Sequence, residues 1–282
     1  MPSPSIAQKQ KLYQRYLQLA EDRRLLAQIF ALLYEPASRD NARRCWVVAM
    51  AKQKHLTKVA TPVPKTFNEQ VSGLIELGVL TQARGRGTCC NPVVIDLVVR
   101  DAVKMETFEP IVEAIAQLFP IGQRYPNGSL FFRNEAQFMR EVRIALYRED
   151  RAAAAALFKA ADSAYWQATL TFDQALCDIL TNPPDVTWID RLSDEFFELG
   201  LTAILTNAVE HCTPADEAFD LLADYCENGQ VGPSLHLLYA EQLWLRGHLD
   251  TAVDVLANLT VDKALAARYG ALMGAIAFLL GD

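Results

Sequence analysis

This sequence of 282 residues lacks the features that mark several protein classes. No apolar run approaches the roughly 18 residues that a membrane-spanning helix needs. The 13 glycines and 13 prolines are scattered along the chain, which excludes collagen-like and low-complexity architectures. The first residues are polar and basic with no apolar segment behind them, so they do not match a signal peptide. With 51% hydrophobic and 22% charged residues, the composition indicates a folded globular protein.

Cysteine and histidine are scarce and poorly grouped. Six cysteines are too few for a disulfide scaffold in a chain of this length, and none is spaced as C-x-x-C. The four histidines are isolated, apart from His211 beside Cys212, and neighbouring residues on a helix point about 100° apart. We therefore expect a reduced, cytoplasmic protein with buried structural cysteines and no metal site.

The common catalytic motifs are also missing. There is no G-x-x-x-x-G-K-[ST] loop, no G-x-G-x-x-G turn that opens a helix, and no G-x-S-x-G elbow. An acidic stretch includes Asp190, Asp194, Glu195 and Glu198, but a solvated helix face explains it more simply than acid–base catalysis. The sequence predicts no catalytic activity, no ATP hydrolysis and no cofactor for these residues.

Charge is distributed unevenly along the chain. Residues 1–150 hold 21 lysines and arginines against 15 acidic residues, a net charge of +6, whereas residues 151–282 hold 6 against 19, a net charge of −13. Such an asymmetry predicts two modules with different partners. The first suits a polyanion, and the second would be repelled by one.

Periodic apolar residues predict helices at the start of the chain. Residues 1–19 form a basic, partly amphipathic lead helix. The next helix buries positions 26, 29, 30 and 33, which follow the i, i+3, i+4, i+7 spacing of one helix face, and Pro36 ends it. Ser38 is the expected N-cap of a third helix over 39–52.

The segment that follows changes character. Thr66 to Glu69 matches a capping box, and the helix that it opens ends at Gly78. A short strand over 79–83, a basic turn and a second strand over 88–90 come next. Three helices followed by a small hairpin are the order of a winged helix-turn-helix, which we predict for residues 20–105. Residues 93–103 are predicted as helix, although their β-branched side chains leave strand as an alternative.

Residues 106–282 are predicted to be helical, so the fold class is mainly α. A period of 34 residues relates Ala218 to Ala252, and the same spacing relates two pairs near the end, Gly247 with Gly281 and Ala240 with Gly274. This period is typical of a tetratricopeptide-like α-solenoid. The expected helices span roughly 106–119, 131–149, 151–166, 172–181, 189–210, 215–226, 234–246, 249–258 and 262–280.

The solenoid pattern stops at the turn where the second helix of a repeat would begin. A repeat without a capping element exposes an apolar face to water. We therefore expect a longer natural protein that is truncated here at its C-terminal end. A short, irregular last repeat is the alternative.

Candidate nucleic-acid contacts lie in the basic half. Cations on one face contact phosphates, a hairpin arginine can enter a minor groove, and amide side chains can read adenine edges. Two glutamates on the presumed recognition helix, Glu69 and Glu76, oppose tight duplex binding. Contact with double-stranded DNA and a purely protein-binding or packing role therefore both stay open. The candidate residues are Arg43, Arg44, Lys65, Asn68, Gln70, Arg84 and Arg86.

Several short motifs together resemble a known family. A helix ends in Leu-Tyr-Glu-Pro at Pro36, the box-capped helix ends in Leu-Gly-Val-Leu at Leu80, Cys90-Asn91-Pro92 and the stretch 99–103 follow, and the tail closes at Asp282. This pattern resembles the long N-terminal region of large bacterial Swi/Snf-type helicases, whose ATPase motor lies far downstream.

The resemblance implies a non-catalytic recognition or regulatory region. Its basic half would contact DNA, and its acidic half would bind a protein partner or the downstream motor domain of the same chain. A protein–protein interaction scaffold or transcriptional regulator without a motor domain is the alternative. Neither interpretation involves a membrane.

Overall fold

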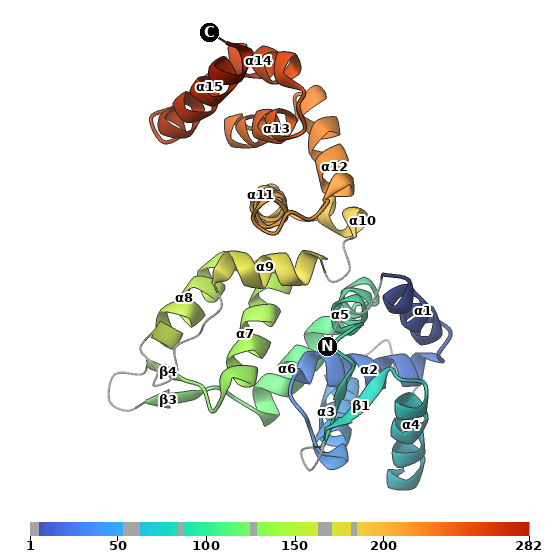
Figure 1. The fold of residues 1–282 in the computed structure, drawn as a ribbon. Helices are drawn as coiled ribbons and strands as arrows, with labels where there is room; N and C mark the ends of the chain where they lie inside the picture. Colours follow the sequence, from blue (N-terminus) through green and yellow to red (C-terminus); the bar gives the residue numbers. More distant parts are fainter. Residues whose placement is uncertain are drawn as a thin grey trace. The chain divides into compact units, whose positions relative to one another are not determined.

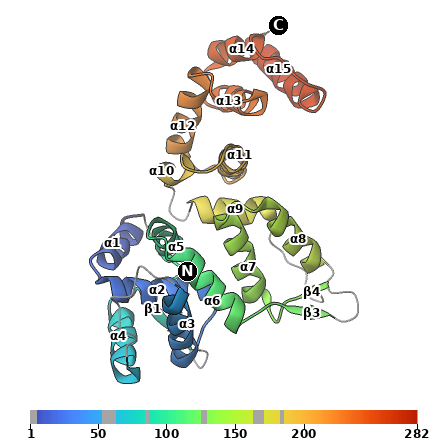
Figure 2. The same ribbon diagram turned by 180° about the vertical axis from the view of Figure 1, so that it is seen from behind.

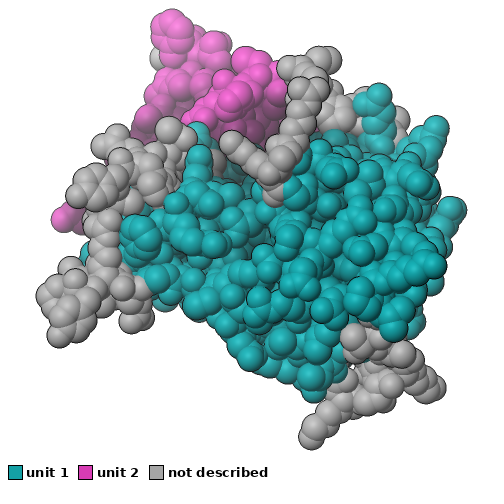
Figure 3. All heavy atoms as spheres, turned by 90° about the horizontal axis from the view of Figure 1, so that it is seen from below, with its two compact units in different colours: residues 1–184 teal, residues 185–282 magenta. Residues whose placement is uncertain are grey.

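The computed structural model describes residues 6–52, 63–83, 87–124, 129–162, 171–181 and 185–281. These ranges contain fifteen helices and four short strands (Figure 1), which confirms the prediction of a mainly helical protein. None of these helices combines the length and the apolar character that crossing a membrane requires. The chain divides into two compact units, residues 1–184 (unit 1) and residues 185–282 (unit 2), which Figure 3 shows in teal and magenta.

The first part of unit 1 follows the predicted order of three helices and a hairpin. Ser38 caps the third of its first three helices, because its Oγ accepts the backbone N–H of Asn41 at 3.1 Å. The elements are α1 (Ile6–Leu17), α2 (Glu21–Leu33), α3 (Arg39–Lys52), α4 (Pro64–Glu76), β1 (Leu80–Ala83) and β2 (Gly87–Cys90).

Helix α4 begins three residues earlier than the capping box predicts, since that box makes Thr66 the N-cap. Its N-cap is Val63, no side chain caps it, and Pro64 occupies the first turn. Proline suits this position because its φ is already helical and its missing N–H would have no partner there. Thr66 therefore lies inside the first turn, so the predicted capping box is wrong.

The hairpin is joined to the chain before α3. Strands β1 and β2 pair antiparallel, with Leu80 opposite Cys90 and Ala83 opposite Gly87. Ala37 adds an isolated bridge to Thr88, with both backbone hydrogen bonds at 2.9 Å. Gly87 has a φ of +103°, and a Cβ there would lie 2.5 Å from the Ala37 carbonyl oxygen. Only glycine allows this close approach.

Residues after the hairpin form helix α5 (Ile95–Lys104), so the strand alternative for this stretch is wrong. Asn91 closes the turn before it rather than capping the helix directly. Its Oδ1 accepts the Val93 N–H at 3.1 Å, and its Nδ2 donates to the Gly78 carbonyl at 2.8 Å. Helix α5 packs against α1, α2 and α6.

The rest of unit 1 contains a hairpin that the sequence analysis missed. Its two strands have three residues each, too few for an alternating pattern to appear. Helices α7, α8 and α9 lie beside one another, and β4 contacts α8 (Figure 1 and Figure 2). The elements are α6 (Phe108–Leu118), β3 (Gly122–Arg124), β4 (Ser129–Phe131), α7 (Glu135–Tyr147), α8 (Arg151–Asp162) and α9 (Phe172–Thr181).

The division between the units differs from the predicted boundary at residue 105. Helix α6 packs extensively on α3, and α7 contacts α2. Residues 106–184 therefore belong to the same compact unit as residues 20–105, which are called the hairpin domain below. The division between the two units falls between Pro184 and Asp185.

Unit 2 is a succession of helices in which chain neighbours pack together. Asp185 caps a short helix, α10, and α11 begins only at Asp194, five residues after the start of the helix predicted over 189–210. Ala218, Ala240 and Ala252 are buried, whereas Gly274 is exposed and a Cβ there would meet no atom within 4 Å. The elements are α10 (Val186–Ile189), α11 (Asp194–Glu210), α12 (Asp216–Glu227), α13 (Pro233–Leu245), α14 (Leu249–Ala257) and α15 (Ala266–Leu280).

Candidate functional site

The predicted DNA-contact residues on α3 and α4 mostly lie at the surface. Arg44 is exposed, and Arg43 is partly exposed with an ion pair to Asp40 at 3.4 Å. Lys65 and Asn68 are exposed on the outer face of α4. Arg84 and Arg86 belong to the three residues that join β1 to β2, and they lie outside the described residues.

Gln70 is only partly exposed, and its side chain makes a contact within the protein. Its Nε2 donates to Asp22 Oδ2 at 2.5 Å, and its Oε1 is buried without a hydrogen-bond partner. The side chain therefore ties α4 to the first turn of α2. The amide of Gln70 is thus engaged within the protein, and its contact with a base edge stays a prediction from the sequence.

Arg39 makes a contact between α3 and α4 that the sequence does not predict. Its guanidinium donates to the Asn68 carbonyl and to Ser72 Oγ, each at 3.3 Å. The first residue of α3 is thereby hydrogen-bonded to the middle of α4. Nothing in the local sequence indicates this contact, because the partners are separated by about thirty residues.

A hollow of about 440 Å³ lies beside α4, along the turn between α1 and α2. Its lining includes Asp22, Arg23, Thr66 and Glu69. Both signs of charge are therefore present along this side of the presumed recognition helix. The uniformly basic surface of a tight duplex binder is not found here.

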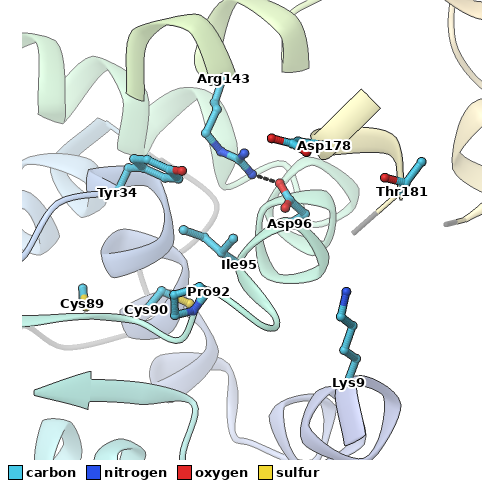
Figure 4. Close-up of a pocket in the computed structure, with 10 residues that line it drawn as sticks. All are labelled: Lys9, Tyr34, Cys89, Cys90, Pro92, Ile95, Asp96, Arg143, Asp178 and Thr181. Carbon is cyan, nitrogen blue, oxygen red and sulfur yellow. Dashed lines mark ion pairs between the residues drawn. The ribbon is translucent and has the colours of Figure 1, made fainter. Parts of the chain in front are cut away.

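A second, larger pocket in unit 1 has a volume of about 500 Å³. Figure 4 shows the side chains that line it, which come from α1, the end of α2, β2, the start of α5, α7 and α9. No single stretch of sequence reveals it. The lining residues are Lys9, Tyr34, Cys89, Cys90, Pro92, Ile95, Asp96, Arg143, Asp178 and Thr181.

The inner wall of this pocket is a buried ion pair. Arg143 pairs with Asp96, and their side chains are 8% and 1% exposed. Tyr147 Oη donates to Asp96 Oδ1 at 2.8 Å, so the carboxylate is held from two sides. Burial raises the pKa of the Tyr147 phenol, which keeps it a hydrogen-bond donor at neutral pH.

Tyr34 completes this wall in a rare backbone conformation. It ends α2 with a φ of +60°, in the left-handed region that aromatic residues seldom adopt. The guanidinium of Arg143 lies over its ring, 4.9 Å from the centroid. Such strain persists only where surrounding contacts hold it, and it is frequent at functional sites.

Helix α5 links this pocket to the rest of unit 1 through buried polar groups. Arg100 is 1% exposed and donates to the Ile179 carbonyl of α9. On the other side, Asp101 accepts hydrogen bonds from Tyr16 Oη at 2.5 Å and from Gln28 Nε2 at 3.0 Å, and it pairs with Arg24 at 2.6 Å. One short helix thus binds α1, α2 and α9.

The cysteines and acidic groups offer no metal centre in the described ranges, where no group of three or more His, Cys, Asp or Glu is placed to hold an ion. All six cysteines are free thiols. Burial raises the pKa of the Cys90 thiol, so it stays protonated beside the pocket.

No protein-family model matches this chain, and no curated protein or solved structure shows significant similarity to it. The resemblance to the N-terminal region of Swi/Snf-type helicases therefore stays a prediction from the sequence.

Proposed function

We propose that residues 20–105 are a winged helix-turn-helix domain that contacts double-stranded DNA. The observation that carries this proposal is the bridge between Ala37 and Thr88. It joins the hairpin to the chain between α2 and α3, and this holds the wing beside the three helices. In this arrangement α4 is the recognition helix, and the hairpin is the wing.

The exposed groups on α4 support a phosphate-contacting surface. Lys65 lies in its first turn, and Asn68 lies one turn further along the same exposed face. Unit 1 holds 23 lysines and arginines against 18 acidic residues, a net charge of +5, so its field attracts a polyanion. Arg84 and Arg86 add two cations between the strands of the wing.

Unit 2 has the opposite character. It holds 4 lysines and arginines against 16 acidic residues, a net charge of −12, which disfavours contact with DNA. We propose that its paired helices are tetratricopeptide-like repeats that bind protein. The buried alanines Ala218 on α12 and Ala252 on α14, which are 34 residues apart, support this proposal, since both helices pack against α13.

These two roles fit a non-catalytic recognition or regulatory region of a Swi/Snf-like DNA helicase. In this proposal the described units carry no ATPase activity of their own, and the motor belongs to another part of the natural protein. Purified 1–282 should not hydrolyse ATP. Turnover that disappears on mutation of a residue within this range would contradict the proposal.

DNA binding is tested by its dependence on salt. The affinity for a fluorescent duplex, measured by anisotropy, should fall steeply between about 50 and 200 mM salt. Replacing both wing arginines, Arg84→Ala with Arg86→Ala, should reduce the slope of log K against log salt by about 2. The matched control removes two cations elsewhere in unit 1, Arg151→Ala with Lys159→Ala, and should leave the slope nearly unchanged.

The second candidate function is a protein–protein scaffold in which the hairpin domain only packs. The observation that favours it is the mixed charge beside α4, where Asp22 and Glu69 line the hollow and Asp22 engages Gln70. Absence of duplex binding at about 50 mM salt would support this candidate, because non-specific contacts are strongest there. Equal effects of the wing variant and its control would also support it.

A further inference from the structure

We propose that the pocket between α1, α5, α7 and α9 binds a small organic acid with one carboxylate, and that Arg143 holds this carboxylate. This inference does not depend on DNA contact by the α4 face. It rests on the unused hydrogen-bond donors of a buried guanidinium, on the contacts that fix this group and on the apolar lining beside it.

The guanidinium of Arg143 is buried, yet part of it has no partner. Its side chain is 8% exposed, and Nη2, which contacts Asp96, has no accessible surface. None of the residues that the structure describes accepts a hydrogen bond from Nε or Nη1, and these two nitrogens keep accessible surface. A guanidinium has five N–H donors and no acceptor. This wall of the pocket therefore needs an acceptor from a ligand or from water.

Neighbouring side chains fix this guanidinium before any ligand arrives. Asp96 pairs with it, and Tyr147 donates to Asp96 Oδ1 at 2.8 Å. The guanidinium lies over the ring of Tyr34, 4.9 Å from the centroid, and Figure 4 shows it between this ring and Asp178. A ligand therefore meets an ordered donor group, and binding costs little side-chain entropy at Arg143.

A carboxylate is the acceptor that suits these donors. Its two oxygens accept from two N–H groups of one guanidinium, and such charge-assisted bonds are about twice as strong as neutral ones. The charge of Arg143 also reaches other walls of the pocket. Burial raises the pKa of Cys90 on β2 and of Asp178 on α9, and the positive charge of Arg143 opposes both rises.

The other charged groups limit the ligand to a single negative charge. Asp96 already pairs with Arg143, and Asp178 lies at an exposed position of the lining. These two carboxylates repel a dianion more strongly than a monoanion. Lys9 also lines the pocket but is engaged with another group, so Arg143 is the cation assigned to the ligand.

The remaining lining suits an apolar tail. Pro92 and Ile95 provide aliphatic surface, and the Tyr34 ring provides aromatic surface (Figure 4). The volume of about 500 Å³ lies within the range of known ligand pockets, roughly 300–1,000 Å³. An acid with one carboxylate and a short apolar or aromatic tail, such as butyrate or benzoate, matches this lining.

The test is calorimetric titration of the full chain with acetate, butyrate, benzoate and phenylacetate. At least one should bind with a dissociation constant below about 1 mM. The neutral amide of that acid should bind at least about tenfold more weakly, because it lacks the charge that Arg143 recognises. Inorganic phosphate should also bind at least about tenfold more weakly, because it carries a second charge and no apolar tail.

The variant Arg143→Lys keeps a cation beside Asp96 but loses the paired donors, so it should weaken binding at least about tenfold. The matched control is Arg148→Lys, at an exposed position that follows the same helix, and it should leave binding unchanged. Circular dichroism establishes that both variants fold.

A second pair of variants tests the same site without altering Arg143. Asp178→Asn removes a like charge and should strengthen binding about two- to fivefold. Asp173→Asn, at an exposed site on the same helix outside the pocket, should have no effect. Lack of binding by all four acids at about 10 mM, equal binding of the amide or of phosphate, equal effects of the two arginine variants, or weaker binding by Asp178→Asn would each overturn the proposal.

Discussion

The two units bury different kinds of side chain. Among the described residues, nine of the ten buried polar or charged side chains lie in unit 1, and only Gln242 lies in unit 2. Unit 1 therefore adds long-range polar contacts centred on α5, such as Tyr16 with Asp101, to its apolar core. Unit 2 is held by apolar and small residues between helices that follow one another in the chain.

Because the buried contacts differ, the two units should respond differently to substitution. A buried carboxylate with three donors has one geometry that satisfies all of them, and removal of the carboxylate leaves several groups unpaired. A contact between small apolar residues depends instead on close packing, so excess volume disturbs it most. Four substitutions test this contrast, and they are described in order of decreasing effect on stability.

The largest effect is expected in unit 1 for Asp101→Ala. The substitution leaves Tyr16, Gln28 and Arg24 without their shared acceptor. The free energy of unfolding should fall by about 3–5 kcal/mol, as is typical when one partner of a buried ion pair is removed. Chemical denaturation measures this change. The control Asp220→Ala, at an exposed site on α12, should change stability by less than about 0.5 kcal/mol. If the two variants lose similar stability, the contrast between the units is refuted.

In unit 2 the corresponding test adds volume. Ala252 is fully buried on α14, which packs against α13. Ala252→Leu should cost about 1–3 kcal/mol through overpacking, and hydrogen exchange should accelerate in both helices. Ala257→Leu places the same side chain at an exposed position of α14 and serves as the control. If the two variants are equally stable, the helices do not meet closely at Ala252.

The third substitution compares helix caps. Asn134 Oδ1 accepts the Gln137 N–H at 2.8 Å at the start of α7, whereas His248 begins α14 without a side-chain cap. Asn134→Ala should cost about 1 kcal/mol. His248→Ala should change stability by less than about 0.5 kcal/mol. Thermal denaturation of both variants measures the difference, and a larger loss for His248→Ala would contradict it.

The smallest effect concerns pH. Because the pKa of Asp178 is raised in the folded state, its contribution to stability is present below the ordinary value of 3.8 and is lost as pH rises through the folded pKa. Without ligand, Asp178→Asn should therefore raise Tm slightly at pH 7, and the gain should shrink toward acid pH. A gain that grows on acidification would reverse the sign and refute the assignment.

The sequence predicts much of the helical framework. The apolar spacing of α2, the Ser38 cap and the hairpin over 79–90 all appear in the structure. These features are local, since each depends on residues within a few turns of one another. Most helices of unit 2 are predicted within a few residues for the same reason, although the helix predicted over 189–210 begins five residues too early.

The candidate sites depend on contacts that local patterns do not encode. Asp96 and Asp101 lie on a stretch whose β-branched residues are compatible with either helix or strand. The local pattern therefore does not predict that their side chains are buried. The local pattern places Gln70 at the surface, because its partner, Asp22, is 48 residues away and leaves no local signal. The pocket draws its lining from six elements, and only the folded chain brings them together.

Hydrogen–deuterium exchange of residues 1–282, with and without a saturating DNA duplex at about 50 mM salt, tests the central claim most directly, because non-specific binding is strongest there. The account predicts slower exchange in α4 (Pro64–Glu76) and in the peptides that span the wing, with no change in α11 to α15. Slower exchange confined to unit 2, or none anywhere despite saturating duplex, would contradict the claim that the basic hairpin domain is the part of this chain that contacts DNA.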